Sequence, residues 1–302
     1  MNGAVLSLLP NAGLGNKLFV WARAAAFAEI NNLDCHCLGW SIPRIGPMLR
    51  GERRNVCYGR YLKSNLCYEL IGASRSVFYH KVYEPPVAEY KANKVGHIFI
   101  YNKIPAWNEY FVSIHNHRQI VIHRFFELPR SAVRKSISGE RRPIVSVHIR
   151  CGDFRELRED EIFANSGNTR TPLTYFIEII HLIRECSGSC VPITVFSDGT
   201  DDKLKPILML ENVARAAALS DFAHLMLMAR SDVIVTSAGS TFSMWAGFLS
   251  NAAIILHPDH IHSRIRPPSL QNVLYEGPAI GPWREWNQSL QAKIQSLSST
   301  RW

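Results

Sequence analysis

The stretch Pro143-Ile-Val-Ser-Val-His-Ile-Arg-Cys-Gly-Asp153 decides the fold that we expect for this chain. Its first part, 144–149, is a short run rich in β-branched residues, as in a strand buried on both faces of a parallel sheet. The run stops at Arg150, and a glycine and a carboxylate follow within three residues. Such a pattern predicts a buried parallel strand of an α/β sheet whose carboxyl end carries polar groups.

Segments with strand and helix patterns alternate after this stretch. The helix patterns have apolar residues three and four positions apart, and the strand patterns are short apolar runs. The expected helices are 172–186, 201–210, 221–230 and 240–249, and the expected strands are 193–196, 233–235 and 253–256. This alternation predicts a doubly wound parallel sheet in the C-terminal part of the chain.

Three of the expected strands end in polar residues. Besides Arg150-Cys-Gly-Asp153, the polar ends are Ser197-Asp-Gly199 and Thr236-Ser-Ala-Gly-Ser-Thr241, and the last of these directly precedes a helix. Because the carboxyl ends of parallel strands meet at one edge of a sheet, we expect the three ends to lie together.

Each polar end offers a group that suits a nucleoside diphosphate. Arg150 presents a planar fork of donors that stays protonated, and Gly152 lets the backbone approach an anion closely. Ser240 and Thr241, with the first amides of a helix, form a cradle for an anion. Asp198 can accept a hydrogen bond from a ribose hydroxyl or a base edge.

Each of these features has a simpler alternative when it is taken singly. Arg150 alone is compatible with a structural salt bridge, and Ser240 with Thr241 is compatible with an ordinary helix cap. His148, inside an apolar strand, is more typical of a core histidine. The coincidence of three polar strand ends in one sheet favours a binding site.

The chain begins with another strand–loop–helix pattern. Residues 4–9 are apolar, 18–30 have helical spacing, and Gly13-Leu-Gly15-Asn16 lies in the turn-rich loop between them. The loop lacks the third glycine of a dinucleotide fingerprint and the ending of a P-loop, so it is compatible with a plain turn. We expect Gly13, Gly15 and Asn16 to close over the same diphosphate from a second domain.

The middle of the chain has weaker patterns. Residues 33–115 read as irregular and aromatic, with Trp40 and Trp107 either as platforms for ring stacking or as core residues. The basic stretch 130–143 ends in proline and reads as a connection. We therefore predict two domains, 1–140 and 141–302, as the length of 302 residues also suggests.

The composition argues against several classes of protein. The chain is 47% hydrophobic and 20% charged, which is ordinary for a globular protein. No run reaches the roughly 18 apolar residues of a membrane-spanning helix, and the first residues lack the basic region of a signal peptide. The seven cysteines are odd in number and scattered, which favours reduced thiols over a disulfide framework. We therefore expect a soluble, cytoplasmic protein.

The net charge of +9 favours anionic partners such as phosphates or an anionic membrane surface. The basic residues are densest at 50–54, 130–142 and 264–266, and they form no long polybasic tail. No zinc-finger spacing or RNA-recognition motif accompanies them, so we expect no nucleic-acid partner.

Four motifs occur along the chain in a characteristic order. They are Gly13-Leu-Gly-Asn-Lys-Leu-Phe19, His148-Ile-Arg-Cys-Gly-Asp-Phe154, Phe196-Ser-Asp198, and the segment from Asp232 through Ser240-Thr-Phe-Ser-Met-Trp-Ala-Gly247. Together they resemble motifs of the bacterial α-1,2-fucosyltransferases and their relatives, the α-1,6- and protein O-fucosyltransferases. The second and fourth motifs are specific, whereas the first and third are weak alone and residues 33–115 match poorly.

The resemblance implies the GT-B architecture, in which two Rossmann-like domains face a cleft. Residues 1–140 would then be the acceptor-side domain, and 141–302 would bind the donor. The implied activity is inverting transfer of L-fucose from GDP-fucose to galactoside O-2 of an oligosaccharide or lipid-linked glycan, without a metal or other cofactor. The alternatives are another GDP-deoxysugar as donor, or a non-catalytic protein that binds a GDP-sugar or glycan.

The same resemblance implies which residues bind the donor. They are Gly13, Gly15, Asn16, His148, Arg150, Gly152, Ser197, Asp198, Ser240, Thr241 and Phe242. Arg150 would hold the β-phosphate, and Asp198 would meet the guanosine. Cys151 replaces the second arginine of the family motif, and Met244 replaces a tryptophan, which leaves the linkage and the sugar open.

The chemistry of the implied reaction assigns two catalytic roles. Negative charge grows on the β-phosphate as its bond to the sugar breaks, so we expect Arg150 to stabilise the transition state. Asp153 is the nearest candidate in sequence for the base that deprotonates the acceptor, and Glu156, Asp160 and Glu161 follow it. Alternatively, Asp153 fixes Arg150 by a salt bridge.

Overall fold

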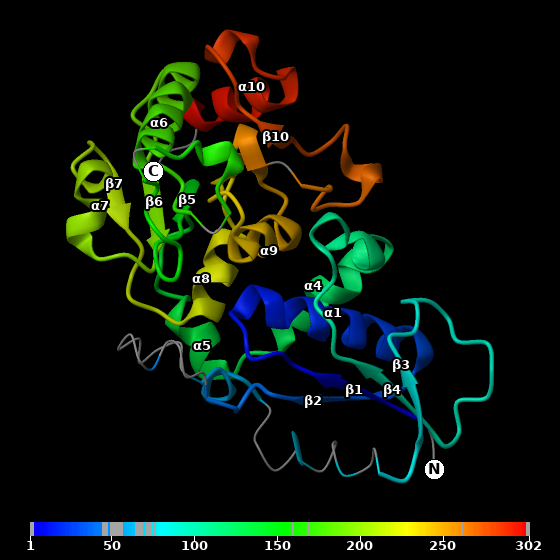
Figure 1. Ribbon diagram of the computed structural model, residues 1–302. Helices are drawn as coiled ribbons and strands as arrows, with labels where there is room; N and C mark the ends of the chain where they lie inside the picture. Colours follow the sequence, from blue (N-terminus) through cyan, green and yellow to red (C-terminus); the bar gives the residue numbers. More distant parts are fainter. Residues whose placement is uncertain are drawn as a thin grey trace. The chain divides into compact units, whose positions relative to one another are not determined.

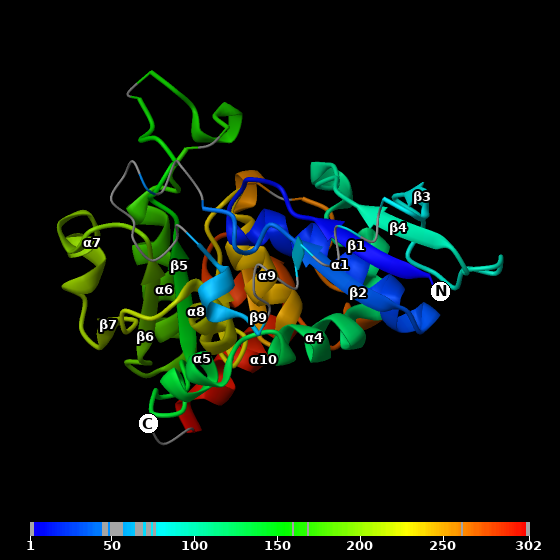
Figure 2. The same ribbon diagram turned by 90° about the horizontal axis from the view of Figure 1, so that it is seen from below.

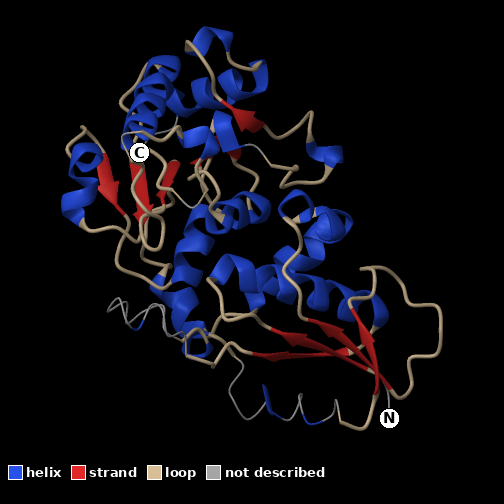
Figure 3. Ribbon diagram, viewed as in Figure 1, coloured by secondary structure: helices blue, strands red, loops and turns tan. Residues whose placement is uncertain are grey.

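The computed structural model describes residues 3–43, 48, 57–63, 69–70, 74, 77–158, 160–167, 169–260 and 262–299. The chain divides into two compact units, each with its own parallel sheet (Figures 1 and 3). The first unit comprises Met1–Gly139 and Ser220–Ala223, and the second comprises Glu140–Leu219 and His224–Trp302. The assignment of acceptor and donor sides to the two parts stays a prediction.

The first unit is built on four parallel strands in the order β2-β1-β4-β3. The strands are β1 (Ala4–Leu8), β2 (Asp34–Leu38), β3 (His80–Tyr83) and β4 (His97–Tyr101), and the helices are α1 (Leu14–Asn31), α4 (Arg118–Glu127) and α5 (Ser131–Ser136). Helix α1 follows β1 and lies along the sheet (Figures 1 and 2), where the Phe27 ring is 4.9 Å from that of Phe99.

The expectation that residues 33–115 are irregular is wrong, because this stretch contributes three of the four strands. Strand β4 is apolar, but β2 and β3 are the polar outer strands of the sheet and read Asp-Cys-His-Cys-Leu and His-Lys-Val-Tyr. These two segments lack a strand pattern in their side chains, and they are strands because their backbones pair with β1 and β4. The predicted connection 130–143 contains α5, and the basic group at 50–54 lies outside the described residues.

The second unit is built on six parallel strands in the order β10-β9-β8-β5-β6-β7. The strands are β5 (Val145–Ile149), β6 (Ile193–Ser197), β7 (Val213–Arg215), β8 (Val233–Val235), β9 (Ala253–Leu256) and β10 (Glu276–Pro278). The helices are α6 (Leu173–Ser187), α7 (Asp201–Leu208), α8 (Asp221–Met228), α9 (Thr241–Leu249) and α10 (Gln288–Gln295). The predicted doubly wound parallel sheet is therefore confirmed.

The two faces of this sheet are covered by different helices. Val145, Val147 and Ile149 of β5 belong to the apolar cluster that includes the buried side chains of α6, α7 and α10. On the opposite face the His148 ring stacks on Phe242 of α9, with ring centroids 5.1 Å apart. Strand alternation thus explains why β5 is buried throughout although it contains a histidine.

The outer strands β7 and β10 and the helix α10 were not predicted from the sequence. Both strands have only three residues, and two of the residues of β10 are a glycine and a proline. Proline donates no hydrogen bond, and it is tolerated here because β10 pairs on one side only, with β9. No helix in the described part of the chain is both long and apolar enough to cross a membrane.

The buried face of α6 provides a test of this packing. Ile180 is fully buried in the core, whereas Ile177 on the same helix is only partly buried. We expect Ile180→Ala to lower the free energy of unfolding by about 2–5 kcal/mol, because it leaves a cavity. Ile177→Ala is the matched control and should cost clearly less in urea denaturation. Equal losses would contradict the assignment of the buried face.

Candidate active site

The candidate site lies where the winding of the second sheet reverses. From β5 the chain adds β6 and β7 on one side, and it then adds β8, β9 and β10 on the other. Ligands of such sheets bind at this switch point, beyond the carboxyl ends of the strands. Ile149 is paired with Ser197, and Val147 is paired with Val235. The register therefore confirms that the three polar strand ends share one edge.

Two serine hydroxyls tie these strand ends together. Ser237 Oγ donates to the His148 carbonyl at 2.8 Å and accepts from the Arg150 amide at 2.8 Å. Ser197 Oγ donates to the Ile149 carbonyl at 2.6 Å. Ser197, which the sequence analysis placed among the donor-binding residues, thus has a structural contact here. Ser237 was overlooked, although a hydroxyl directly after a buried strand was a usable signal.

Arg150 is held between two carboxylates. Its guanidinium forms ion pairs with Asp198 and Asp153, and the side chain of Arg150 is one-quarter exposed. Asp198 also accepts a hydrogen bond from the Cys151 amide at 2.7 Å. Both oxygens of Asp198 are therefore used to fix Arg150 and its loop, whereas Asp153 pairs with Arg150 from a half-exposed position.

Gly152 makes room for this arginine–aspartate pair. A Cβ atom at position 152 would collide with Asp198 Oδ2 and lie 3.3 Å from Arg150 Cζ. Cys151, which stands where the family motif has a second arginine, is buried instead, and burial raises the pKa of its thiol. The Cys151 side chain packs beneath Gly199, where a Cβ would lie 2.7 Å from Sγ.

A second guanidinium near the site comes from Arg170, which the sequence analysis did not single out. Its Nε donates to the carbonyls of Cys151 at 3.1 Å and Phe154 at 2.8 Å, and the side chain forms an ion pair with Glu156. The next residue, Thr171, accepts a hydrogen bond from the Ala238 amide at 3.0 Å. Residues 170–171 therefore brace the loops after β5 and β8, and no local sequence pattern signals this.

Helix α9 begins at the same edge without a side-chain cap. Ser240 is the N-cap residue, but its hydroxyl makes no capping hydrogen bond. Gly239 before it has a φ of 70°, which glycine adopts without steric cost. The first amides of a helix have no partner within the helix, and they carry its positive dipole end. The simpler alternative of Ser240 as an ordinary cap does not describe this helix.

His148 lies beneath the start of α9. The side chain is buried on β5, stacks on Phe242, and leaves Nδ1 without a hydrogen-bond partner among the described residues. Burial lowers the pKa of His148 to about 3, so the ring is neutral at physiological pH. Unpartnered buried polar atoms are uncommon in native proteins.

The predicted N-terminal loop belongs to the first unit and is described there by itself. Gly13 is the N-cap of α1, and Gly15 and Asn16 lie in the first turn. Asn16 Oδ1 is buried without a partner in the described part of the chain, and the buried Lys17 donates to the Gly39 carbonyl at 2.7 Å.

The two candidate stacking residues of the same unit differ in exposure. Trp40 is fully buried, with its ring 5.9 Å from that of Phe222, so it is a core residue and the stacking interpretation is wrong for it. Trp107 is 41% exposed and packs edge-on against Tyr110.

The other acidic candidates lie on the loop after β5. Glu156 is paired with Arg170, and Glu161 is paired with Arg155, which lowers the pKa of Glu161 to about 2. Asp160 is exposed. Among the described residues, no group of three or more His, Cys, Asp or Glu side chains is arranged to hold a metal ion.

Two α/β units, each built on a parallel sheet, give this chain a fold of the GT-B class. Residues 87–261 match the model of glycosyl transferase family 11, and the chain belongs to this family. No curated protein matches the sequence.

Solved structures with a similar fold include the fucosyltransferase NodZ from Bradyrhizobium. This match has a TM-score of 0.53 at 11% identity and covers 85% of this chain and 96% of NodZ. A structure of NodZ α-1,6-fucosyltransferase co-crystallized with GDP matches with a TM-score of 0.53 at 11% identity and covers 85% of this chain and 95% of that one. A structure of the same enzyme soaked with GDP-fucose matches with a TM-score of 0.51 at 12% identity and covers 84% of this chain and 94% of that one. At these identities the likeness establishes the fold alone.

The buried His148 predicts a specific pH dependence of stability. Its pKa is lower in the folded chain than in the unfolded chain, so the unfolded state binds the proton more tightly. Stability is therefore complete above about pH 6.5 and falls as the pH drops toward 3. The free energy of unfolding of the parent protein should therefore fall between pH 7.5 and pH 5. We expect this fall to be about 2 kcal/mol smaller in His148→Phe, which has no ring to protonate.

Urea denaturation at both pH values measures this difference. His181→Phe, at an exposed position of α6, is the control and should keep the pH dependence of the parent protein. An unchanged pH dependence in His148→Phe would show that His148 is not a buried neutral ring.

Proposed function

We propose that this chain is an inverting fucosyltransferase that moves L-fucose from GDP-fucose to a hydroxyl of a glycan. Membership of glycosyl transferase family 11 supports transfer of a sugar. The NodZ structures, one with GDP and one with GDP-fucose, support the choice of donor. We further propose galactoside O-2 as the acceptor position, with no metal ion required.

One observation carries the proposal: Arg150 and the start of α9 converge at the switch point. The Arg150 amide donates to Ser237 Oγ, and the Ser237 carbonyl accepts from the Ser240 amide at 3.2 Å. The single turn 237–240 therefore joins the backbone of Arg150 to the start of α9. A guanidinium and uncapped helix amides are both donors for phosphate oxygens. We assign the β-phosphate to Arg150 and to the first amides of α9, at Thr241 and Phe242.

Binding of the donor then requires an exchange of partners on Arg150. Arg150, Asp153 and Asp198 together carry one net negative charge, which disfavours a diphosphate. Asp153 is half-exposed, whereas Asp198 is mostly buried and also anchored to the Cys151 amide. We propose that the β-phosphate replaces Asp153 on Arg150, while Asp198 stays and positions the guanidinium. The contact of Asp198 with guanosine that the family resemblance implies would require it to leave both partners.

The exchange links donor binding to the chemistry of transfer. In the reaction the bond from C1 of the sugar to the β-phosphate oxygen breaks, and a bond from C1 to the acceptor oxygen forms. Arg150 stabilises the charge that develops on the leaving GDP, which such preorganised donors do most strongly in the transition state. The displaced Asp153 carboxylate takes the proton from the acceptor hydroxyl.

The remaining candidates have supporting roles in this proposal. His148 and Phe242 form a stacked pair beneath the start of α9 and set its position. Gly152 and Ser197 keep the strand ends close, and Gly13, Gly15 and Asn16 close over the diphosphate from the first unit. The acceptor is an oligosaccharide or lipid-linked glycan, and the net charge of +9 fits peripheral contact with an anionic membrane.

Substitutions of Arg150 test the donor site. We expect Arg150→Ala to lower kcat by about 100-fold or more with GDP-fucose, because a preorganised cation is lost. Arg150→Lys should recover only part of this, since the fork geometry is missing. Release of GDP from a panel of GDP-sugars, with glycan acceptors, measures turnover and donor choice together.

Arg142→Ala is the control for this experiment, because Arg142 pairs with Asp232 at the amino end of β8. An unchanged kcat in Arg150→Ala would exclude the catalytic role. Turnover with another GDP-sugar but not with GDP-fucose would refute the assigned donor, and binding of GDP without any turnover would refute the enzymatic function.

Replacing Asp153 distinguishes two roles, that of the general base and that of a salt-bridge partner that only fixes Arg150. If Asp153 is the base, Asp153→Asn should lower kcat by about 100-fold or more and remove the acidic limb of the pH–rate profile. It should also lower the Kd for GDP, because the competing carboxylate is neutralised. If Asp153 only fixes Arg150, kcat should change little while GDP binding tightens. Asp202→Asn, at an exposed position of α7 outside the candidate residues, is the control.

A further inference from the structure

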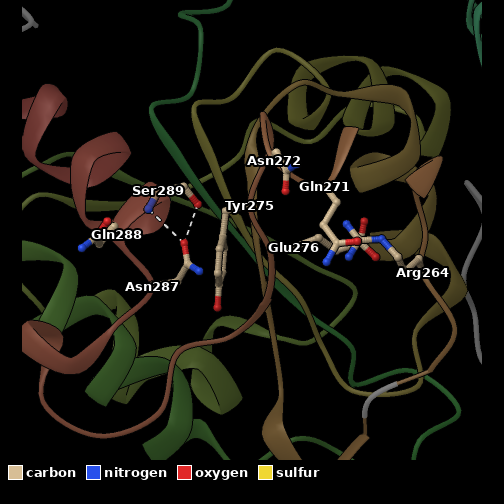
Figure 4. A pocket seen from close by; sticks show the side chains of 8 residues that line it. All are labelled: Arg264, Gln271, Asn272, Tyr275, Glu276, Asn287, Gln288 and Ser289. Atoms are coloured by element: carbon tan, nitrogen blue, oxygen red, sulfur yellow. Dashed lines mark hydrogen bonds between the residues drawn. The ribbon is translucent and has the colours of Figure 1, made fainter. Parts of the chain in front are cut away.

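A hollow of about 450 Å³ lies beside β10, at the outer edge of the second sheet (Figure 4). Strands β9 and β8 separate β10 from β5, so β10 lies three strand spacings, or roughly 14 Å, from the strand that carries Arg150. The volume is within the range of small-molecule sites. No residue of the hollow belongs to the donor site assigned above.

Four amide side chains line this hollow from two segments of the chain. Gln271 and Asn272 precede β10, and Asn287 and Gln288 lie at the start of α10. Within the described ranges, no hydrogen bond engages the side chains of Gln271, Asn272 or Gln288. A carboxamide has both donors and acceptors, which matches a sugar hydroxyl that donates and accepts at once.

Asn287 is held in one orientation by its neighbour on the helix. Its Oδ1 accepts from the Ser289 amide at 2.9 Å and from Ser289 Oγ at 2.6 Å. The amide nitrogen therefore points away from Ser289, as Figure 4 shows. This fixes the orientation of two N–H donors in the lining of the hollow before any ligand binds.

Tyr275 provides a fixed ring in the same hollow. Its hydroxyl donates to the Pro278 carbonyl at 2.6 Å, and burial raises the pKa of Tyr275 to about 12, so the side chain stays neutral. A tyrosine ring offers apolar surface for the C–H face of a sugar next to polar groups for its hydroxyls.

The charges of the hollow favour a neutral ligand. Arg264 and Glu276 are its only two charged lining residues among those described, and their charges cancel. Glu276 is further engaged by the backbone, since its oxygens accept from the amides of Ile265 at 2.7 Å and Arg266 at 3.1 Å. A phosphate would meet little net positive charge here.

From these contacts we infer that the hollow beside β10 is a second carbohydrate-binding site, which takes a neutral oligosaccharide. It holds a part of the acceptor glycan away from the reacting hydroxyl. Only this identification of the ligand with the acceptor rests on the proposed function, because binding of a neutral sugar needs neither donor nor turnover.

The test measures sugar binding by the full chain in the absence of any nucleotide. Lactose, N-acetyllactosamine, maltotriose and chitotriose are titrated separately and followed by isothermal calorimetry. We expect at least one of them to bind, and Gln271→Ala combined with Gln288→Ala to weaken that binding by about tenfold. Gln295→Ala is the control, because Gln295 is an exposed amide on α10 outside the hollow.

The outcomes separate this inference from the proposed function. Loss of sugar binding in the double variant, with unchanged melting temperature and unchanged GDP affinity, supports the second site. No binding by the parent chain, or equal binding by parent and double variant, overturns it. Inorganic phosphate that competes with the bound sugar would overturn the assignment of a neutral ligand. A chain that binds lactose but shows no transfer would leave this site standing while the proposed function fails.

Discussion

Strand β5 is the constraint on which the second unit depends. It is hydrogen-bonded on both sides, to β6 and β8, and each of its residues is buried. Such a strand cannot shift by one residue without exchanging its two faces, so its register is strongly determined. The position at which it ends therefore fixes where Arg150 leaves the sheet. The loops after β6 and β8 are aligned to that point by the same pairing.

At this edge the guanidinium of Arg150 is paired with carboxylates and is not exposed as an isolated positive charge. Arg150 contacts Asp198 and Asp153, and Gly152 leaves the space in which the first of these pairs forms. Charges near a protein surface interact at moderate effective dielectric, so such pairs are exchangeable rather than permanent. Of the two carboxylates, Asp153 is the more exposed, which is why we propose that it is the one that a phosphate displaces.

Much of this site was predictable because it depends on the ends of strands. A short apolar run that stops in charged residues is visible in sequence, and the parallel topology brings such ends together without further information. Arg150, Asp198 and the start of α9 were found in this way. Ser237 and Arg170 were not, because their hydrogen bonds reach backbone groups of residues that are distant in sequence. Strands β7 and β10 were missed because Val-Ala-Arg and Glu-Gly-Pro are not apolar runs, whereas the equally short β8 reads Val-Ile-Val.

The sequence by itself determined the alternation of strands and helices, the family motifs and the edge of the sheet at which the polar strand ends meet. These features follow from local periodicity and from the geometry that all parallel sheets share. Only the tertiary structure decided the partners of each polar group: that Asp198 braces Arg150, that Cys151 is buried where an arginine was expected, and that Trp40 belongs to the core. The physical reason is that a residue type fixes which contacts a side chain can make, whereas burial and long-range packing fix which of them it does make.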